Sequence, residues 1–168
     1  SIVSVPTSAA TSSAGGLFGN KTNYGDITVT NSYAVFDSLS GDDVGGILGN
    51  FGGYGYAHFS NLYSAVQHAT WNVRGSGIGM VTTETATSPN PQLAMSNCYF
   101  EDAVFDVGIH GYATGTDTHQ VNYMDDICYK PSFADALNVD GAMYKVADDT
   151  EVRRGYPFLM WEPQIDFE

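Results

Sequence analysis

The chain has 168 residues, in which nineteen Asp and Glu residues outnumber six Lys and Arg residues and give a net charge of −13. This charge repels nucleic acid and anionic lipid headgroups, so neither is an expected partner. The sequence has no apolar run near the roughly 20 residues that span a bilayer and no signal-type leader before Ser1, so membrane insertion is not expected.

The first predicted element is half a repeat unit, residues 1–14. It precedes a glycine motif that starts at Gly15 and returns thirty residues later at Gly45. Counting back by the spacing of the repeat aligns the first five residues with residues 31–35, so we expect the chain to begin within a strand. An open strand edge offers backbone groups for strand addition. The candidate assembly edge therefore consists of Ser1, Ile2, Val3, Ser4 and Val5.

A glycine motif and a tyrosine keep the same spacing along the chain and divide it into four units. The motif is complete at residues 15–19 and 45–49, and partial copies begin at Gly75 and Gly111. A tyrosine follows the last glycine of each unit after 14 residues, except in the third unit, where the distance is 20. The six extra residues are expected to form a surface loop around residues 88–91. Two landmarks that keep register through an insertion predict four units with a 30-residue period.

Each unit is predicted to carry one strand after its glycine turn. The strand segments are rich in alternating apolar and β-branched residues, and no 3.6-residue period is visible before residue 130. The predicted strands are residues 27–36, 57–67, 93–100 and 121–129. We therefore expect residues 1–129 to be all-β, with units that start at Gly15, Gly45, Gly75 and Gly111 stacked as a parallel solenoid.

Residues 130–168 are predicted to be a C-terminal cap. Residues 132–138 are expected to form a short helix with Ser132 as its N-cap. Residues 143–161 supply enough apolar side chains to cover one end of the solenoid, where unpaired backbone groups would otherwise invite aggregation.

The repeat resembles the GLUG repeats of bacterial surface and secreted proteins. The matching residues are Gly15–Gly19 with Val29, Asn31 and Tyr33, Gly45–Gly49 with Phe59, Asn61 and Tyr63, and Gly77–Gly79 with Met95, Asn97 and Tyr99. The fourth unit departs from the pattern, with Asp125 and Ile127 where an apolar residue and Asn are expected. The ending, residues 155–161, is similar to the Gly-Tyr-Pro segment that closes such arrays. The resemblance implies a right-handed parallel β-helix of about four turns and a role in adhesion or surface display, and it implies no catalytic residues.

The residues at equivalent positions of the units are interpreted as structural. Glycines suit tight corners or close approach between units, asparagines can form a ladder of amide hydrogen bonds, and tyrosines can stack or, if they face outward, bind sugar rings. A phosphate-binding loop would need a following helix and a lysine. The candidate structural residues are Gly15, Gly19, Gly45, Gly49, Gly75, Gly79, Gly111, Gly115, Asn31, Asn61, Asn97, Tyr33, Tyr63, Tyr99 and Tyr129.

Two cysteines, Cys98 and Cys128, each precede a landmark tyrosine. Stacked strands place equivalent residues about 4.8 Å apart, within the range of a disulfide. A second interpretation is a pair of free thiols, because Ser32 and Leu62 stand at the same place in the other units and indicate a small, partly buried side chain.

No cofactor is expected, and the four histidines fall at four different places in the repeat, so they do not predict a metal cluster. Acidic groups at residues 42–43, 125–126 and 148–151 indicate either a solvated surface or calcium ligands, although none has the spacing of a defined calcium loop.

The sequence favours a non-enzymatic, extracellular or cell-surface protein, either an adhesin module or the subunit of a filament. Its partner would be a second copy or a longer parent chain joined by end-to-end strand addition. One alternative is a carbohydrate-binding module with a tyrosine-lined face, and another is a polysaccharide-active enzyme that uses paired carboxylates.

Overall fold

The computed structural model describes residues 2–4, 13–21, 25–52, 55–81, 92–111, 115–147 and 152–162. Most of these residues lie in strands. The strands are β1 (Ile2–Ser4), β2 (Ser13–Gly15), β3 (Phe18–Lys21), β4 (Ile27–Gly45), β5 (Leu48–Phe51), β6 (Tyr56–Ser76), β7 (Gly79–Val81), β8 (Gln92–Glu101), β9 (Ile109–Gly111), β10 (Gly115–Val121), β11 (Tyr144–Lys145) and β12 (Phe158–Leu159). The helical segments are the π-helix η1 (Tyr123–Ile127), the α-helix α1 (Pro131–Leu137) and the 3₁₀-helix η2 (Val152–Gly155).

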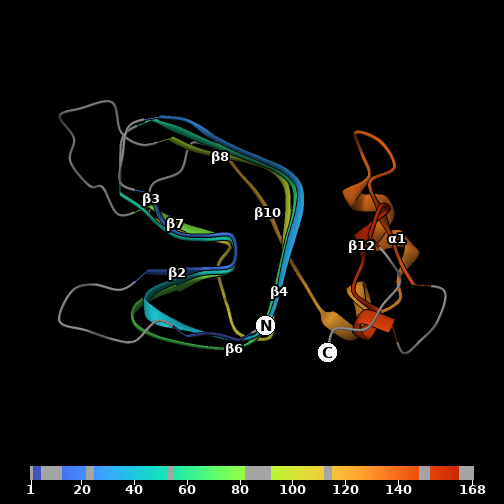
Figure 1. Cartoon of the computed structure of the whole chain (residues 1–168), viewed down its shortest axis with the longest axis horizontal. Helices are drawn as coiled ribbons and strands as arrows, with labels where there is room; N and C mark the ends of the chain where they lie inside the picture. The colour runs from blue at the N-terminus through green and yellow to red at the C-terminus, as the bar shows by residue number, and fades with distance from the viewer. Residues whose placement is uncertain are drawn as a thin grey trace.

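Two parallel sheets contain the repeat. The large sheet has the order β1-β4-β6-β8-β10, with β2 also paired to β4, and the small sheet has the order β3-β5-β7-β9. The long strands β4 and β6 overlie each other and curve around the small sheet (Figure 1). A 30-residue offset governs most of this pairing, for example between Tyr33 and Tyr63 and between Phe18 and Leu48. Residues one repeat apart therefore lie on neighbouring strands, and we call the strands of one repeat unit a layer.

The interior between the sheets is apolar. Its largest fully buried side chains include Phe51, Phe59, Leu39, Ile47, Leu48, Leu62 and Ile78. Burial of such side chains is the main favourable term in folding, and the columns that they form hold the layers in register.

An asparagine in each of the first three layers changes which residues of the strand face inward. Asn31, Asn61 and Asn97 have φ of 48°, 52° and 52°, in the left-handed region that Asn tolerates better than most side chains. Before Asn61 the buried core residues are Ala57 and Phe59, and after it they include Leu62 and Val66. The asparagine therefore bends each strand and shifts the inward positions by one residue, while the 30-residue offset between β4 and β6 is the same on both sides of it.

The glycine corners are explained by close approach between layers. A Cβ atom on Gly46 would collide with the carbonyl oxygen of Gly77, and one on Gly16 with that of Gly46. In the third unit, however, Gly45 faces Ser76, and Gly75 faces Val44. The prediction that Gly75 is the first glycine of its unit is wrong. The pairing of β4 with β6 shifts by one residue between Gly41 and Asp43, so Ser76 takes the position equivalent to Gly45.

The fourth unit also differs from the prediction. Gly111 faces Val81 rather than a leading glycine. Gly115 begins β10 and faces Ala94, so it is not the end of a glycine turn. The strand predicted at residues 121–129 is wrong, because the parallel pairing ends at Val121 and a π-helix follows.

Two shortened segments cause this error. Sixteen residues separate Tyr63 from Gly79, whereas ten separate their partners Tyr99 and Ile109. The chain takes a short path through residues 102–108 and cancels the six-residue insertion that precedes β8. The distance from Ile109 to His119 is also short, at ten residues against fifteen from Leu48 to Tyr63. Extending the earlier tyrosine spacing past residue 101 therefore misplaced the fourth strand.

The N-terminal residues pair with β4 in another register than predicted. Ile2, Val3 and Ser4 face Ser38, Leu39 and Ser40, and not residues 32–34. The two registers differ in the face that β4 presents, because Leu39 belongs to the core whereas Tyr33 lies on the outer face. Ser1 and Val5 of the predicted edge lie outside the described residues.

The C-terminal segment covers the outer face of the large sheet. In Figure 1, α1 and β12 lie beside β4 and β10, across from the small sheet. We call described residues 123–147 and 152–162 the C-terminal cover. Its helix starts at Pro131, at N1, with Lys130 as an N-cap that makes no side-chain bond, so the N-cap prediction for Ser132 is wrong. The predicted end cap is in fact a lateral cover.

Candidate functional site

A row of aromatic rings marks the outer face of the large sheet. Tyr33, Tyr63 and Tyr99 occupy one register position of β4, β6 and β8. The rings of Tyr33 and Tyr63 are stacked, with centroids 5.3 Å apart and planes at 7°. The fourth position belongs to His119, whose ring lies 5.0 Å from that of Tyr99. Tyr129 is not in the row, because it follows η1 and its backbone N–H donates to the carbonyl of Gly155.

The C-terminal cover closes over this row. Phe133 meets Tyr63 and Tyr99 edge-on, with ring centroids 5.5 and 5.2 Å away. Tyr156 stacks near Tyr63 at 6.4 Å, and the hydroxyl of Tyr63 donates to the carbonyl of Pro157. Tyr63 is fully buried. A sugar ring therefore has no access to the centre of the tyrosine row, where the carbohydrate-binding interpretation placed it.

The asparagine row also meets the cover. The side-chain amide of Asn97 donates to the Oδ1 of Asn61 at 3.0 Å and to the carbonyl of Ala136 at 2.8 Å. Asn61 in turn donates to a carboxylate oxygen of Asp140 at 2.7 Å. These asparagines thus link neighbouring layers and hold the loop after α1, so their role is structural.

One buried acid lies in the contact between sheet and cover. The carboxylate of Glu101 accepts hydrogen bonds from the hydroxyl of Tyr156 at 2.9 Å and the amide of Gln67 at 3.3 Å. Burial raises the pKa of Glu101 above its ordinary value, and the hydrogen bonds from Tyr156 and Gln67 oppose the rise. Tyr156 is itself buried, and its pKa is raised, so it is a neutral donor.

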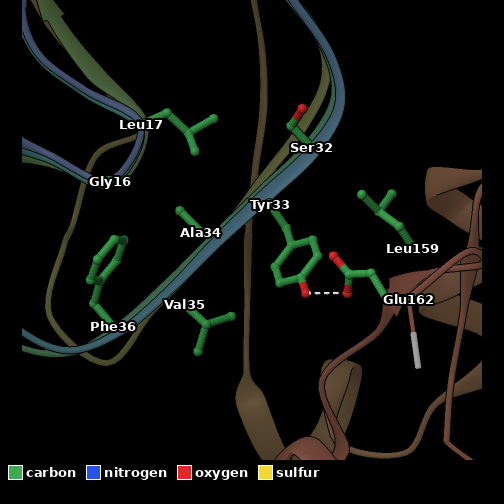
Figure 2. Close-up of a pocket in the computed structure, with 9 residues that line it drawn as sticks. All are labelled: Gly16, Leu17, Ser32, Tyr33, Ala34, Val35, Phe36, Leu159 and Glu162. Carbon is green, nitrogen blue, oxygen red and sulfur yellow. Dashed lines mark hydrogen bonds between the residues drawn. The ribbon is translucent and has the colours of Figure 1, made fainter. Parts of the chain in front are cut away.

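A groove opens at the first-layer end of the sheets (Figure 2). It has a volume of about 360 Å³ and is lined by Gly16, Leu17, Ser32, Tyr33, Ala34, Val35, Phe36, Leu159 and Glu162. Figure 2 shows Ala34 and Phe36 on the side of Leu17, and Tyr33 on the side of Glu162, to which its hydroxyl donates at 2.7 Å. The groove therefore lies astride β4, between the sheet interior and the cover.

The core column at this end is incompletely covered. Leu17 is 42% exposed, whereas Ile47 and Ile78, which follow it in the same column, are 0% exposed. An exposed leucine at a position that is buried in the next two layers indicates an unfinished core.

A hollow opens at the last-layer end. It also has a volume of about 360 Å³ and is lined by Phe100, Asp106, Val107, Gly108, Ile109, Thr118 and Gln120. Val107 is exposed there. The described part of the chain thus has an accessible apolar surface at each end of its layers.

The two cysteines are free thiols in the structure. Cys98 lies in the core opposite Leu62 and Thr118, while Cys128 follows η1. The prediction that Cys98 and Cys128 occupy neighbouring equivalent positions is wrong, because Thr118 faces Cys98. Burial raises the pKa of Cys98 to about 12, so this thiol is unreactive in the folded chain.

Three of the described acidic residues have protein partners. Asp42 accepts from the amide of Asn72 at 2.8 Å, and Asp43 lies 3.5 Å from the Nε of Arg74. Asp126 accepts from the backbone N–H of Asn122 at 2.8 Å. Residues 148–151 lie outside the described residues. Within the described ranges, no three His, Cys, Asp or Glu side chains are grouped so that they could hold a metal ion.

No helix among the described residues has the length and apolar character needed to cross a membrane. Comparison of the chain with protein-family models, curated proteins and solved structures finds no match.

Proposed function

We propose that the chain is a right-handed parallel β-helix of about four turns that works as a non-enzymatic extracellular scaffold, either an adhesin module or a filament subunit. Parallel pairing with a 30-residue offset supports the architecture. The resemblance of the Gly and Asn positions to GLUG repeats supports the handedness and the surface role. The abundance of glycine and tyrosine and the low lysine content suit a secreted or surface-displayed chain.

The observation that carries the proposal is the contrast between the covered face and the open ends. The centre of the tyrosine row is buried under the C-terminal cover, whereas Leu17 is exposed beside a mostly apolar groove at one end and Val107 is exposed beside a hollow of mixed polarity at the other. Apolar surface and strand edges at the ends of a repeat array are sites for partner contact. The ends therefore serve as the contact surfaces of the scaffold.

Surface location is tested on intact producing cells. Antibody raised against the folded chain should label intact and permeabilised cells equally, and protease added outside should remove the signal. A cytoplasmic marker protein is the control for cell integrity. Labelling that requires permeabilisation would overturn the extracellular assignment.

A carbohydrate-binding module is the second candidate, now located at the first-layer groove. Tyr33, Ser32 and Glu162 place an aromatic ring, a hydroxyl and a carboxylate beside one another there, the chemistry that commonly recognises sugars. Glycan-array binding that is lost in Tyr33→Ala and retained in Tyr56→Ala would favour this candidate. Equal binding by both variants would dismiss it.

A further inference from the structure

We infer that the two ends of the chain bind each other in separate copies, so that the last layer of one copy stacks head to tail on the first layer of the next. The partner is a second copy of this chain, and Leu17 of one copy lies over Gly108 of the other. This inference rests on the β-helix scaffold proposed above and names the partner of its ends.

The corner of each layer shows the polarity of the contact. The backbone N–H of Leu17 donates to the carbonyl of Ile47 at 2.9 Å, Ile47 donates to Ile78 at 2.9 Å, and Ile78 donates to Gly108 at 2.8 Å. Each layer thus donates to the next in one direction. A second copy placed on the last layer brings the carbonyl of its Leu17 to the N–H of Gly108 and continues the series.

The shapes of the two ends are complementary. The column that begins with the exposed Leu17 ends at Gly108, a residue without a side chain, at the rim of the hollow lined by Phe100 and Ile109. A leucine added as the next member of this column would enter a hollow that has Phe100 and Ile109 on its apolar side and Thr118 and Gln120 on its polar side. Stacking therefore buries the apolar surface that each end exposes alone.

Register positions predict the remaining contacts. The small sheet continues if β9 of one copy pairs with β3 of the next, and the large sheet continues if β10 pairs with β4. The predicted pairs across the junction are Gly108 with Leu17, Ile109 with Phe18, Thr118 with Ser32 and His119 with Tyr33.

The side chains of the junction favour a second copy of this chain over an unrelated strand. The ring of His119 lies 5.0 Å from that of Tyr99 in its own copy, tilted by 31°, and its next neighbour would be Tyr33, whose hydroxyl donates to Glu162. An imidazole is thus placed on an aromatic face close to a carboxylate. An unrelated strand would cover one end of a single chain, whereas a second copy covers the last layer of one chain and the first layer of the other in the same contact.

The contact joins two different surfaces, so it is heterologous and propagates into an open filament. The net charge of −13 opposes this association. Because dissolved salt screens repulsion between copies, raising the salt concentration should lengthen the assemblies.

The test uses two single variants that each block one end. Leu17→Asp and Val107→Asp put a charge into the junction from opposite sides, and both residues are exposed in the single copy, so the fold should be retained. Circular dichroism and thermal melting check that retention. Val139→Asp is the matched control, because Val139 is exposed on the C-terminal cover.

Sedimentation velocity and negative-stain microscopy are the readouts. Wild type and Val139→Asp should form assemblies that grow with protein and salt concentration, and each blocked variant alone should be monomeric. An equimolar mixture of the blocked variants should give dimers and nothing longer, because each retains one intact end.

A wild-type chain that stays monomeric at every concentration, or blocked variants that stay monomeric when mixed, would overturn the head-to-tail contact. Equal loss of assembly in Val139→Asp would show non-specific association and would overturn it too. A monomeric chain that is nevertheless displayed on the cell surface would leave the proposed function standing and refute only this inference.

Discussion

The outer face of the large sheet and the ends of the layers are built from the same repeat but meet different surroundings. On the face, Tyr63 is enclosed by Tyr33 on one side and by Phe133 and Tyr156 of the cover. At the first-layer end, Leu17 belongs to a core column and is 42% exposed. A repeat buries its apolar surface only where a neighbouring layer or a cover exists.

This difference shows where the chain completes its own structure and where it does not. The cover is held by specific polar contacts, including the hydroxyl of Tyr144, which lies 2.9 and 2.8 Å from the carbonyls of Ser32 and Asn61. At the ends, apolar columns and strand edges stop without an equivalent cover among the described residues. The face is therefore a stability element, and the ends are available for contact.

The largest effect is expected from Tyr63→Ala. Removing this fully buried ring ends its stacking with Tyr33 and Tyr156 and leaves a cavity between sheet and cover. The free energy of unfolding should fall by about 3–5 kcal/mol. Denaturant unfolding measures the change. Tyr56→Ala is the control, because Tyr56 is exposed and should change stability by about 0.5 kcal/mol or less. Similar losses in the two variants would contradict a closed face.

A second pair of variants compares one column at a closed and an open position. Ile47→Ala removes a side chain that is 0% exposed and should cost about 2–5 kcal/mol. Leu17→Ala removes a half-exposed side chain from the same column and should cost about 1 kcal/mol or less in the single copy. Unfolding is measured at a protein concentration where both variants are monomeric. Equal losses would show that the first-layer end is not open.

The repeat was predictable from the sequence where the backbone makes a local demand. Asn31, Asn61 and Asn97 have a left-handed backbone conformation, which few side chains tolerate. Gly46 lies so close to the carbonyl oxygen of Gly77 that no side chain fits there. These requirements recur in the first three layers, so glycine and asparagine return at a regular spacing in the sequence. The large parallel sheet follows from that spacing together with the alternating strands.

The fourth layer and the position of the cover were not predictable in the same way. The deletion in residues 102–108 removes no motif residue, and Tyr129 lies by coincidence at the expected distance, so the spacing pointed to the wrong strand. Whether apolar residues of the cover pack on an end or on a face depends on which surfaces meet in three dimensions. The spacing of residues along the chain does not distinguish packing on an end from packing on a face.

Asn61 should have an intermediate effect that separates backbone strain from hydrogen bonding. Asn61→Gly retains a backbone that accepts the left-handed φ but loses the bonds to Asn97 and Asp140. Asn61→Ala loses the bonds and also strains the backbone, so it should be less stable than Asn61→Gly by about 1 kcal/mol. Thermal or denaturant unfolding of both variants measures the gap. A more stable alanine variant would mean that the left-handed backbone conformation is not required at this position.

Glu101 should have the smallest effect, and one that depends on pH. Its pKa is raised in the folded chain, chiefly by burial, so the folded state holds the proton more tightly than the unfolded state. The stability that protonated Glu101 contributes is complete below its unfolded pKa and is lost as pH rises through the folded value. Glu101→Gln keeps a neutral partner for Tyr156 and should remove this component of the pH dependence, which denaturant unfolding from acidic to neutral pH measures. The control is Asp135→Asn, because Asp135 is exposed and does not contribute to the raised pKa of Glu101, so this variant should retain the wild-type profile. If Glu101→Gln has the wild-type profile as well, Glu101 is ionised without penalty and the cover does not exclude water from it.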